Sequence, residues 1–271
     1  MSGSPFSLSR RNALVTGGGR GIGAAVSRLL AQCGANVCVG FQSRQADAEA
    51  VAAECRAFGV SASVHGGDIS SAEGARALVT HAASTIGPID ICIHSAGIWP
   101  VDETPVADLD DARWATTMRQ NVDAMFFITR AAIAAMTSGP PAAMSERVLG
   151  RKSDGGRIVL VASTAGQRGE AMHADYAASK GAMIAFVKSV AVEVAPHGVT
   201  VNAVAPGWVD TEMCELPFRD GGKERIAKGI PVGRIATPAD IAFPIVSLCF
   251  AGARHVTGEI VNVNGGSVLC G

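Results

Sequence analysis

Several residue types are scarce in this sequence, and each shortage excludes a class of protein. Tyr176 is the only tyrosine, and aromatic residues make up 5% of the 271 positions. Charged residues are 17% and the formal net charge is −1, so no overall field attracts nucleic acid or an anionic membrane. No apolar run reaches the roughly 18 residues of a membrane span, and residues 1–11 lack the apolar stretch of a secretory signal. We expect a globular protein without nucleic-acid or membrane partners.

The seven cysteines form no recognisable metal or redox pattern. No Cys-x-x-Cys is present, and no Cys/His spacing is typical of zinc. Their number is odd, and four lie in or beside apolar runs, where a cysteine is usually a small buried hydrophobic residue. We therefore expect no metal site and a location in the reducing cytoplasm.

Short apolar segments alternate with longer helical patterns along the chain. The expected strands are 13–15, 37–39, 60–65, 89–94, 158–161, 199–204 and 259–263, and helices are expected at 22–33 and 45–58. The strands lack a regular alternation of polar and apolar residues, as expected when helices cover both faces of a sheet. This pattern predicts an α/β fold with a doubly wound, Rossmann-type parallel sheet of about seven strands. We expect a single domain, 1–271, with a flexible Ser/Gly/Pro-rich arm at 1–10.

A glycine-rich segment follows the first expected strand and opens the first expected helix. It reads Thr16-Gly17-Gly18-Gly19-Arg20-Gly21-Ile22-Gly23. Gly17 and Gly21 permit positive φ angles and close approach to a ligand, and Gly23 permits tight helix packing. The free N–H groups and the helix dipole at Ile22 favour a pyrophosphate. The segment therefore predicts a dinucleotide site.

A serine, a tyrosine and a lysine provide the candidate chemistry. Tyr176 and Lys180 are one helical turn apart, and Ser163 follows the expected strand 158–161. A free phenol has a pKa of about 10, and a nearby ammonium group lowers it. Tyr176 can then exchange a proton with a carbonyl oxygen while a hydride moves at carbon, with Ser163 donating to the substrate oxygen.

The order of these motifs resembles the short-chain dehydrogenase/reductase family in its compact one-domain form. The resemblance runs from about Arg11 to Gly266. It rests on the glycine segment, Asp68, 94–97 (His-Ser-Ala-Gly), Asn121, Ser163, Tyr176, Lys180, 202–207 (Asn-Ala-Val-Ala-Pro-Gly) and 264–266 (Asn-Gly-Gly). It implies hydride transfer between a nicotinamide cofactor and a secondary alcohol or ketone, by a homotetramer or homodimer. Asn121 joins the catalytic set, holding a water that links Lys180 to solvent.

The resemblance also implies a set of cofactor contacts. Asp68 would accept from the adenine amino group, although it is also a candidate N-cap for a helix starting near Ser71. The family usually has Asn-Asn-Ala-Gly where this chain has 94–97, and we expect His94 to be structural, with Ser95 replacing part of the missing hydrogen bonds. The expected contacts are Gly17, Arg20, Gly21, Ile22, Gly23, Ser43, Arg44, Asp68, Ile69, Ser95, Ala96, Gly97, Tyr176, Lys180, Pro206, Gly207, Val209 and Thr211.

The end of the second expected strand bears on the choice of cofactor. It reads Val39-Gly40-Phe41-Gln42-Ser43-Arg44, without the acidic residue that usually holds the ribose 2′-OH of NAD. Arg20 and Arg44 could pair with a 2′-phosphate, and Ser43 could add a hydroxyl. We expect NADP(H) in preference to NAD(H).

The substrate is less closely defined by the sequence. Segment 211–235 is expected to be a substrate lid, and its apolar residues favour a hydrophobic secondary alcohol or ketone. Further candidate cleft residues are Trp99, Met172, His173 and Trp208.

The alternative function is a 3-oxoacyl-[acyl-carrier-protein] reductase, a branch that the chain also resembles. Such enzymes tend to have basic residues before the fifth and sixth strands. Asp154 and His197 stand there instead, although Arg151 and Lys152 could substitute. Arg151, Lys152 and Asp154 lie in the expected insertion 137–156, where the family usually has a shorter loop. His197 lies just before the expected strand 199–204.

Two other classes share part of this pattern. A cofactor-binding regulator without catalysis would not need Asn121, Ser163, Tyr176 and Lys180 together. An epimerase or dehydratase of the extended type shares Tyr-x-x-x-Lys but needs a larger C-terminal substrate domain, which we do not expect here.

Overall fold

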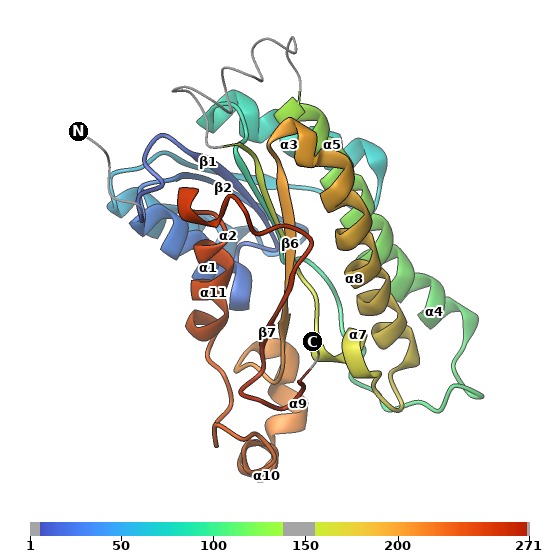
Figure 1. Cartoon of the computed structure of the whole chain (residues 1–271). Helices are drawn as coiled ribbons and strands as arrows, with labels where there is room; N and C mark the ends of the chain where they lie inside the picture. The colour runs from blue at the N-terminus through green and yellow to red at the C-terminus, as the bar shows by residue number, and fades with distance from the viewer. Residues whose placement is uncertain (1–5, 138–154, 270–271) are drawn as a thin grey trace.

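The computed structural model describes residues 6–137 and 155–269, and a parallel sheet forms the centre of this part of the chain. Seven strands are hydrogen-bonded in the order β3-β2-β1-β4-β5-β6-β7 (Figure 1). The strands are β1 (Asn12–Thr16), β2 (Asn36–Phe41), β3 (Ala62–Gly66), β4 (Ile91–His94), β5 (Arg157–Val161), β6 (Thr200–Pro206) and β7 (Ile260–Val263). Each neighbouring pair is parallel. The predicted doubly wound sheet is confirmed.

Helices cover both faces of the sheet (Figure 1). On one face lie α1 (Gly21–Gln32), α2 (Gln45–Ala57) and α11 (Pro238–Ser247). On the other lie α3 (Ala72–Ile86), α4 (Asp111–Met118), α5 (Ala124–Thr137) and α8 (Ala174–Val194). A π-helical turn, η1 (Arg119–Asp123), joins α4 to α5, and η2 (Ala195–His197) and η4 (Ala251–Ala253) are 3-10 turns. The short elements α7 (Thr164–Arg168), η3 (Glu212–Cys214), α9 (Glu215–Phe218) and α10 (Gly222–Lys228) lie at the carboxyl ends of the strands.

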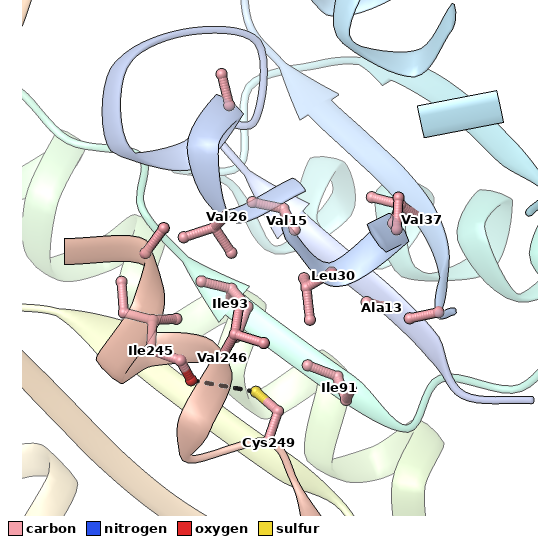
Figure 2. Close-up of a cluster of buried hydrophobic side chains, with 14 of the residues drawn as sticks. Ala13, Val15, Val26, Leu30, Val37, Ile91, Ile93, Ile245, Val246 and Cys249 are labelled. Atoms are coloured by element: carbon pink, nitrogen blue, oxygen red, sulfur yellow. Dashed lines mark hydrogen bonds between the residues drawn. The ribbon is translucent and has the colours of Figure 1, made fainter. Parts of the chain in front are cut away.

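Successive residues of a strand enter two different cores. Ala13 and Val15 of β1 pack on the α1 and α11 face, whereas Leu14 packs on the opposite face. Figure 2 shows the first of these cores, where side chains of β1 and β4 meet Ile245 and Val246 of α11. Because helices cover both faces, most positions of β1, β2, β4, β5 and β6 are apolar, which accounts for the apolar runs in the sequence.

The described part of the expected N-terminal arm packs on the domain. Leu8 is buried, and its backbone N–H donates to the carbonyl oxygen of Cys33 at 2.8 Å. Of the expected insertion 137–156, residues 138–154 lie outside the described part. No helix within the described ranges is both long enough and apolar enough to cross a membrane.

Candidate active site

A cleft lies at the carboxyl ends of β1 and β4, where the strand order changes direction. The chain runs from β1 to β2 and β3 in one direction and from β4 toward β7 in the other, so β1 and β4 flank the position where α/β proteins usually bind ligands. The cleft there has a volume of about 890 Å³. It is lined by these predicted residues: Gly17, Arg20, Gly21, Ile22, Ser43, Asp68, Ile69, Ser95, Ala96, Gly97, Ser163, Tyr176, Lys180, Pro206, Gly207, Val209 and Thr211. The predicted residues Gly23, Arg44 and Asn121 lie beside it rather than on its wall.

The glycine segment has the geometry of a phosphate-binding loop. Gly17 has φ +61°, and a Cβ there would lie 3.0 Å from the backbone of Ala96. A Cβ at position 23 would overlap the carbonyl oxygen of Gly17, so α1 can start this close to the loop only because residue 23 is glycine. Arg20, at the N-cap position of α1, makes no side-chain cap, which leaves the first amides of the helix available. The loop therefore fits a dinucleotide pyrophosphate.

Thr16 ties the turn after β4 to the end of β1. Its Oγ1 accepts from the N–H groups of Ser95 and Ala96, each at 3.2 Å, so it donates its single hydrogen to Nδ1 of His94 at 2.9 Å. His94 is fully buried, and burial together with repulsion from Lys180 lowers its pKa to about 3. Thr16 thus supplies the hydrogen bonds that the sequence had assigned in part to the Ser95 hydroxyl. Thr16 and His94 are opposite each other in the parallel register of β1 and β4, and this pairing was not predicted from the sequence.

Ser163, Tyr176 and Lys180 meet at the cleft from two elements. Ser163 is the N-cap of α7, accepting the N–H of Ala165 at 3.1 Å, and its hydroxyl also forms a hydrogen bond with the phenol of Tyr176. Tyr176 and Lys180 lie one turn apart on α8. The Nζ of Lys180 donates to the carbonyl oxygen of Val161 at 2.8 Å and lies 5.7 Å from the centre of the Tyr176 ring.

The protonation states of Tyr176 and Lys180 are set by burial. Burial raises the pKa of Tyr176, the hydrogen bond from Ser163 opposes this, and the charge of Glu170 raises the pKa further. Burial lowers the pKa of Lys180 to about 8. Lys180 is not among the groups that shift the Tyr176 pKa, so the lowering expected from this lysine is not found. Tyr176 is a neutral phenol, the form that can donate a proton to a carbonyl oxygen.

Asn121 lies in the π-helical turn η1 and is fully buried. Its side-chain N–H groups donate to the carbonyl oxygen of Ile98 and to Oγ of Ser179, both at 3.0 Å, and its Oδ1 accepts from the N–H of Ile98 at 2.8 Å. The side chain therefore joins the loop after β4 to α8. Single π turns occur often at functional sites. The water-holding role of Asn121 stays a prediction.

A buried ion pair next to Tyr176 was missed by the sequence reasoning. The carboxylate of Asp175 accepts from Nε of Arg113 at 3.1 Å and from Oγ1 of Thr117 at 2.8 Å. Burial alone would raise the pKa of Asp175, but these hydrogen bonds outweigh it and hold the pKa below its ordinary value. Arg113 also donates to Oγ1 of Thr104 at 2.7 Å. The network fixes α4, the 102–104 loop and the start of α8 relative to one another.

Asp68 does not cap α3, so that interpretation of the sequence is wrong. The N-cap is Ser71, whose Oγ accepts the N–H of Gly74 at 3.0 Å. The carboxylate of Asp68 instead accepts the N–H of Ser70 at 2.9 Å, and hydrogen bonds from Ser70 lower the pKa of Asp68. Asp68 and Ile69 line the cleft, in keeping with the expected adenine contact.

The two arginines expected to face a 2′-phosphate share a carboxylate partner. Nη1 of Arg20 lies 2.9 Å from Oε2 of Glu212, and Nη1 of Arg44 lies 3.7 Å from the same oxygen. Arg44 also pairs with Asp47 at 2.6 Å. Glu212 is remote in the sequence, so its presence here was not predicted.

Aromatic side chains form one wall at the other end of the cleft. Trp99 stacks on His173 with ring centres 4.8 Å apart and meets Trp208 edge-on at 6.0 Å. Trp99 and Trp208 line the cleft as expected, whereas His173 is buried behind Trp99 and Met172 is exposed outside. Glu170, which the sequence reasoning did not select, also lines the cleft, and burial raises its pKa.

The cysteines within 6–137 and 155–269 are free thiols, and four of them are buried. Burial raises the pKa of Cys92 and Cys249 to about 12, so both behave as small core side chains, as predicted. Over the same ranges, no group of three or more His, Cys, Asp or Glu side chains is placed to hold a metal ion.

Comparisons with known proteins agree on one family. The model of the short chain dehydrogenase family matches residues 11–220. The 3-oxoacyl-[acyl-carrier-protein] reductase FabG of Pseudomonas aeruginosa is 34% identical over 97% of this chain and 100% of its own length. Nodulation protein G of Azospirillum brasilense is 32% identical over 96% of this chain and 98% of its own.

Solved structures agree with this assignment. A short-chain dehydrogenase/reductase from Brucella melitensis superimposes with a TM-score of 0.84 at 32% identity, covering 98% of this chain and 99% of that one. A Beutenbergia cavernae protein with NADP bound at low occupancy gives a TM-score of 0.84 at 34% identity, covering 97% and 99%. The chain thus belongs to the short-chain dehydrogenase/reductase family and is an NAD(P)-dependent oxidoreductase that transfers a hydride between a nicotinamide cofactor and a CH–OH or C=O group.

Proposed function

We propose that this enzyme uses Tyr176 as its acid and base, with Ser163, Lys180 and Asn121 around it. The observation that carries the proposal is the meeting of Ser163, Tyr176 and Lys180 on the wall of the cleft that also contains the glycine loop. A bound nicotinamide cofactor supplies or accepts the hydride. The chain's own residues handle the substrate oxygen and its proton.

In the reducing direction, the neutral phenol of Tyr176 donates its proton to the carbonyl oxygen as negative charge develops there. The hydroxyl of Ser163 lies next to the phenol of Tyr176, and it turns its single hydrogen toward the same substrate oxygen and stabilises that charge. The ammonium group of Lys180 then favours the phenolate that remains. Because the Lys180 pKa is about 8, this lysine can pass a proton back to the phenolate at neutral to mildly basic pH.

NADP(H) is the proposed cofactor in preference to NAD(H). No acidic residue stands at the end of β2, and the guanidinium groups of Arg20 and Arg44 both pair with the same carboxylate, that of Glu212. Two arginines suit a phosphate because each offers several N–H donors in one plane. The NADP held by the Beutenbergia cavernae structure supports this proposal.

A hydrophobic secondary alcohol or ketone is the proposed substrate, covered by the segment 211–235 as a lid. Trp99, Trp208, Met213 and Ile226 supply an apolar surface in the cleft near Tyr176. Reduction of 3-oxoacyl thioesters of acyl carrier protein is the second candidate, supported by the full-length similarity to FabG. Of the positions relevant to a carrier protein, His197 is exposed, and 151–154 lie outside the described residues.

A homotetramer or homodimer in the cytoplasm is proposed from exposed apolar side chains and free thiols. α5 presents Phe126, and Arg130 lies 4.8 Å from the centre of its ring. At the C-terminal end Leu269 is exposed, whereas Val268 is buried within its own chain. The free thiols support a reducing compartment. Light scattering of the purified protein measures the assembly, and a monomer would contradict it.

The test of the function is a substrate screen that follows the absorbance of reduced nicotinamide. NADPH and then NADH are supplied with an acetoacetyl thioester, aromatic ketones, alicyclic ketones and sugars. Turnover of free ketones with NADPH is expected. Turnover confined to the thioester would replace the first substrate proposal by the second, and a tenfold preference for NADH, about 1.4 kcal/mol, would overturn the cofactor proposal.

A further inference from the structure

Glu212 occupies the space between the two arginines proposed to bind a 2′-phosphate. It is the first residue of η3, and Oε2 lies 2.9 Å from Nη1 of Arg20 and 3.7 Å from Nη1 of Arg44. Arg44 has a second carboxylate partner in Asp47. For Arg20, Glu212 is the one ion-pair partner found in the described parts of the chain.

This contact joins the glycine loop directly to the start of the segment 211–235. A Cβ added at Gly21 would lie 3.3 Å from Cγ2 of Thr211, so Thr211 and Glu212 rest on the loop. The ion pair therefore holds the first turn of that segment over the cofactor end of the cleft.

The three side chains can change partners without burying a charge. Arg20, Arg44 and Glu212 are 58%, 52% and 55% exposed. Exposed ion pairs stabilise by at most about 1 kcal/mol because water screens them. A phosphate monoester carries close to two negative charges and three acceptor oxygens, so it is a stronger partner for two guanidinium groups than one carboxylate.

We propose that Glu212 competes with the 2′-phosphate of NADP(H) for Arg20 and Arg44, and that the phosphate releases the first turn of the segment 211–235. The inference rests on the proposed cofactor site and refines it. Glu212 is then a specificity-determining residue, which lowers the affinity for the phosphate-bearing cofactor and leaves the affinity for NAD(H) nearly unchanged.

The first test measures the Kd of NADPH and of NADH from the fluorescence of the bound reduced nicotinamide. In Glu212→Gln the Kd of NADPH is expected to fall about two- to fivefold, the range of one exposed ion pair, with a smaller change for NADH. The matched control is Glu224→Gln, which removes the same charge from an exposed position on α10. Equal changes for the two cofactors, or the same shift in the control, would overturn the proposal.

A larger Kd for NADH in Glu212→Gln, with the Kd of NADPH unchanged, would also overturn the proposal. Glu212 would then act as the acceptor for a ribose hydroxyl. If the wild-type protein binds NADH more tightly than NADPH, the proposed cofactor preference fails. The shift in the NADPH/NADH ratio between wild type and Glu212→Gln still tests the competition in that case.

The second test needs neither nicotinamide nor turnover. Amide hydrogen exchange of residues 212–218 is compared in wild-type protein saturated with adenosine 2′,5′-bisphosphate or with 5′-AMP. The bisphosphate is expected to speed exchange in this turn, and 5′-AMP is expected to leave it unchanged. The same exchange with both probes would show that the 2′-phosphate does not displace Glu212.

Discussion

An arginine–carboxylate pair lies next to each end of the cleft, but the two pairs have opposite surroundings. At the catalytic end, the side chain of Arg113 is 14% exposed and that of Asp175 is fully buried, with Thr117 as a further donor. At the cofactor end, Arg20 and Glu212 are both more than half exposed.

The difference separates a contact that fixes geometry from one that can exchange. A buried carboxylate cannot lose its partner without a large desolvation cost, so the Arg113–Asp175 pair holds the start of α8, and with it Tyr176, in place. An exposed pair has water as an alternative partner, so Arg20 remains available for a ligand. The proposed site for the proton is therefore rigid, and the proposed site for the cofactor is adjustable.

The largest effect is expected from a substitution that removes the proposed acid, Tyr176. Tyr176→Phe is expected to lower kcat by at least about 10²- to 10⁴-fold, the usual contribution of general acid–base catalysis, because no other tyrosine is present to replace it. The Kd of the cofactor is expected to stay nearly constant, since the ring is kept. Steady-state kinetics and cofactor fluorescence measure the two quantities. Activity within a factor of about ten of wild type would remove Tyr176 from its proposed role.

The next largest effect is expected when the buried Arg113–Asp175 pair is broken, which tests whether the pair stabilises the fold. Arg113→Gln is expected to lower the free energy of unfolding by about 3–5 kcal/mol, because it leaves the Asp175 carboxylate buried without its cation. Urea unfolding measures the change. Adding Asp175→Asn to the first variant removes the stranded charge and is expected to recover part of the loss. A loss below about 1 kcal/mol would show that this pair behaves like an exposed one.

A smaller effect concerns His94, which is buried as a neutral ring. Its folded pKa of about 3 lies below the unfolded value of about 6.5, so between these values the unfolded chain binds the proton first. Stability therefore falls as the pH falls from about 6.5 toward 4, by at most about 1.4 kcal/mol per pH unit for one proton. His94→Asn is expected to flatten this slope. Parallel curves of unfolding free energy against pH for the two proteins would contradict the prediction.

The smallest effect is expected at the exposed end. Arg20→Gln, the same substitution as at Arg113, is expected to change the free energy of unfolding by less than about 1 kcal/mol, because both partners are already solvated. Urea unfolding under identical conditions gives the direct comparison. If the two substitutions destabilise equally, exposure does not distinguish the two pairs.

Much of the fold was predictable because its signals are local. Apolar runs marked each strand to within about two residues, as with 158–161 against the observed Arg157–Val161. The glycine segment predicted its own conformation, since Gly17 has a positive φ and Gly23 leaves no room for a Cβ. The order of motifs then placed most of the expected cofactor contacts on one cleft.

The contacts missed were those between side chains far apart in the chain. Asp175 meets Arg113 across 62 positions, and Glu212 meets Arg20 across 192. The error at Asp68 was local but depended on which of two nearby side chains reached the helix amides, and Ser71 does so. No spacing rule resolves such choices, because they depend on register, rotamer and packing.

The sequence by itself determined the elements, their parallel order and the chemical groups available, because periodicity and backbone restrictions act over a few residues. Only the tertiary structure decided the environment of each group. Burial keeps Tyr176 neutral, lowers the pKa of Lys180 to about 8 and makes the Arg113–Asp175 pair permanent. Exposure leaves Arg20 and Glu212 free to exchange partners. The physical reason is that the free energy of a charge depends on the water and partners around it, and these are fixed only when distant segments pack together.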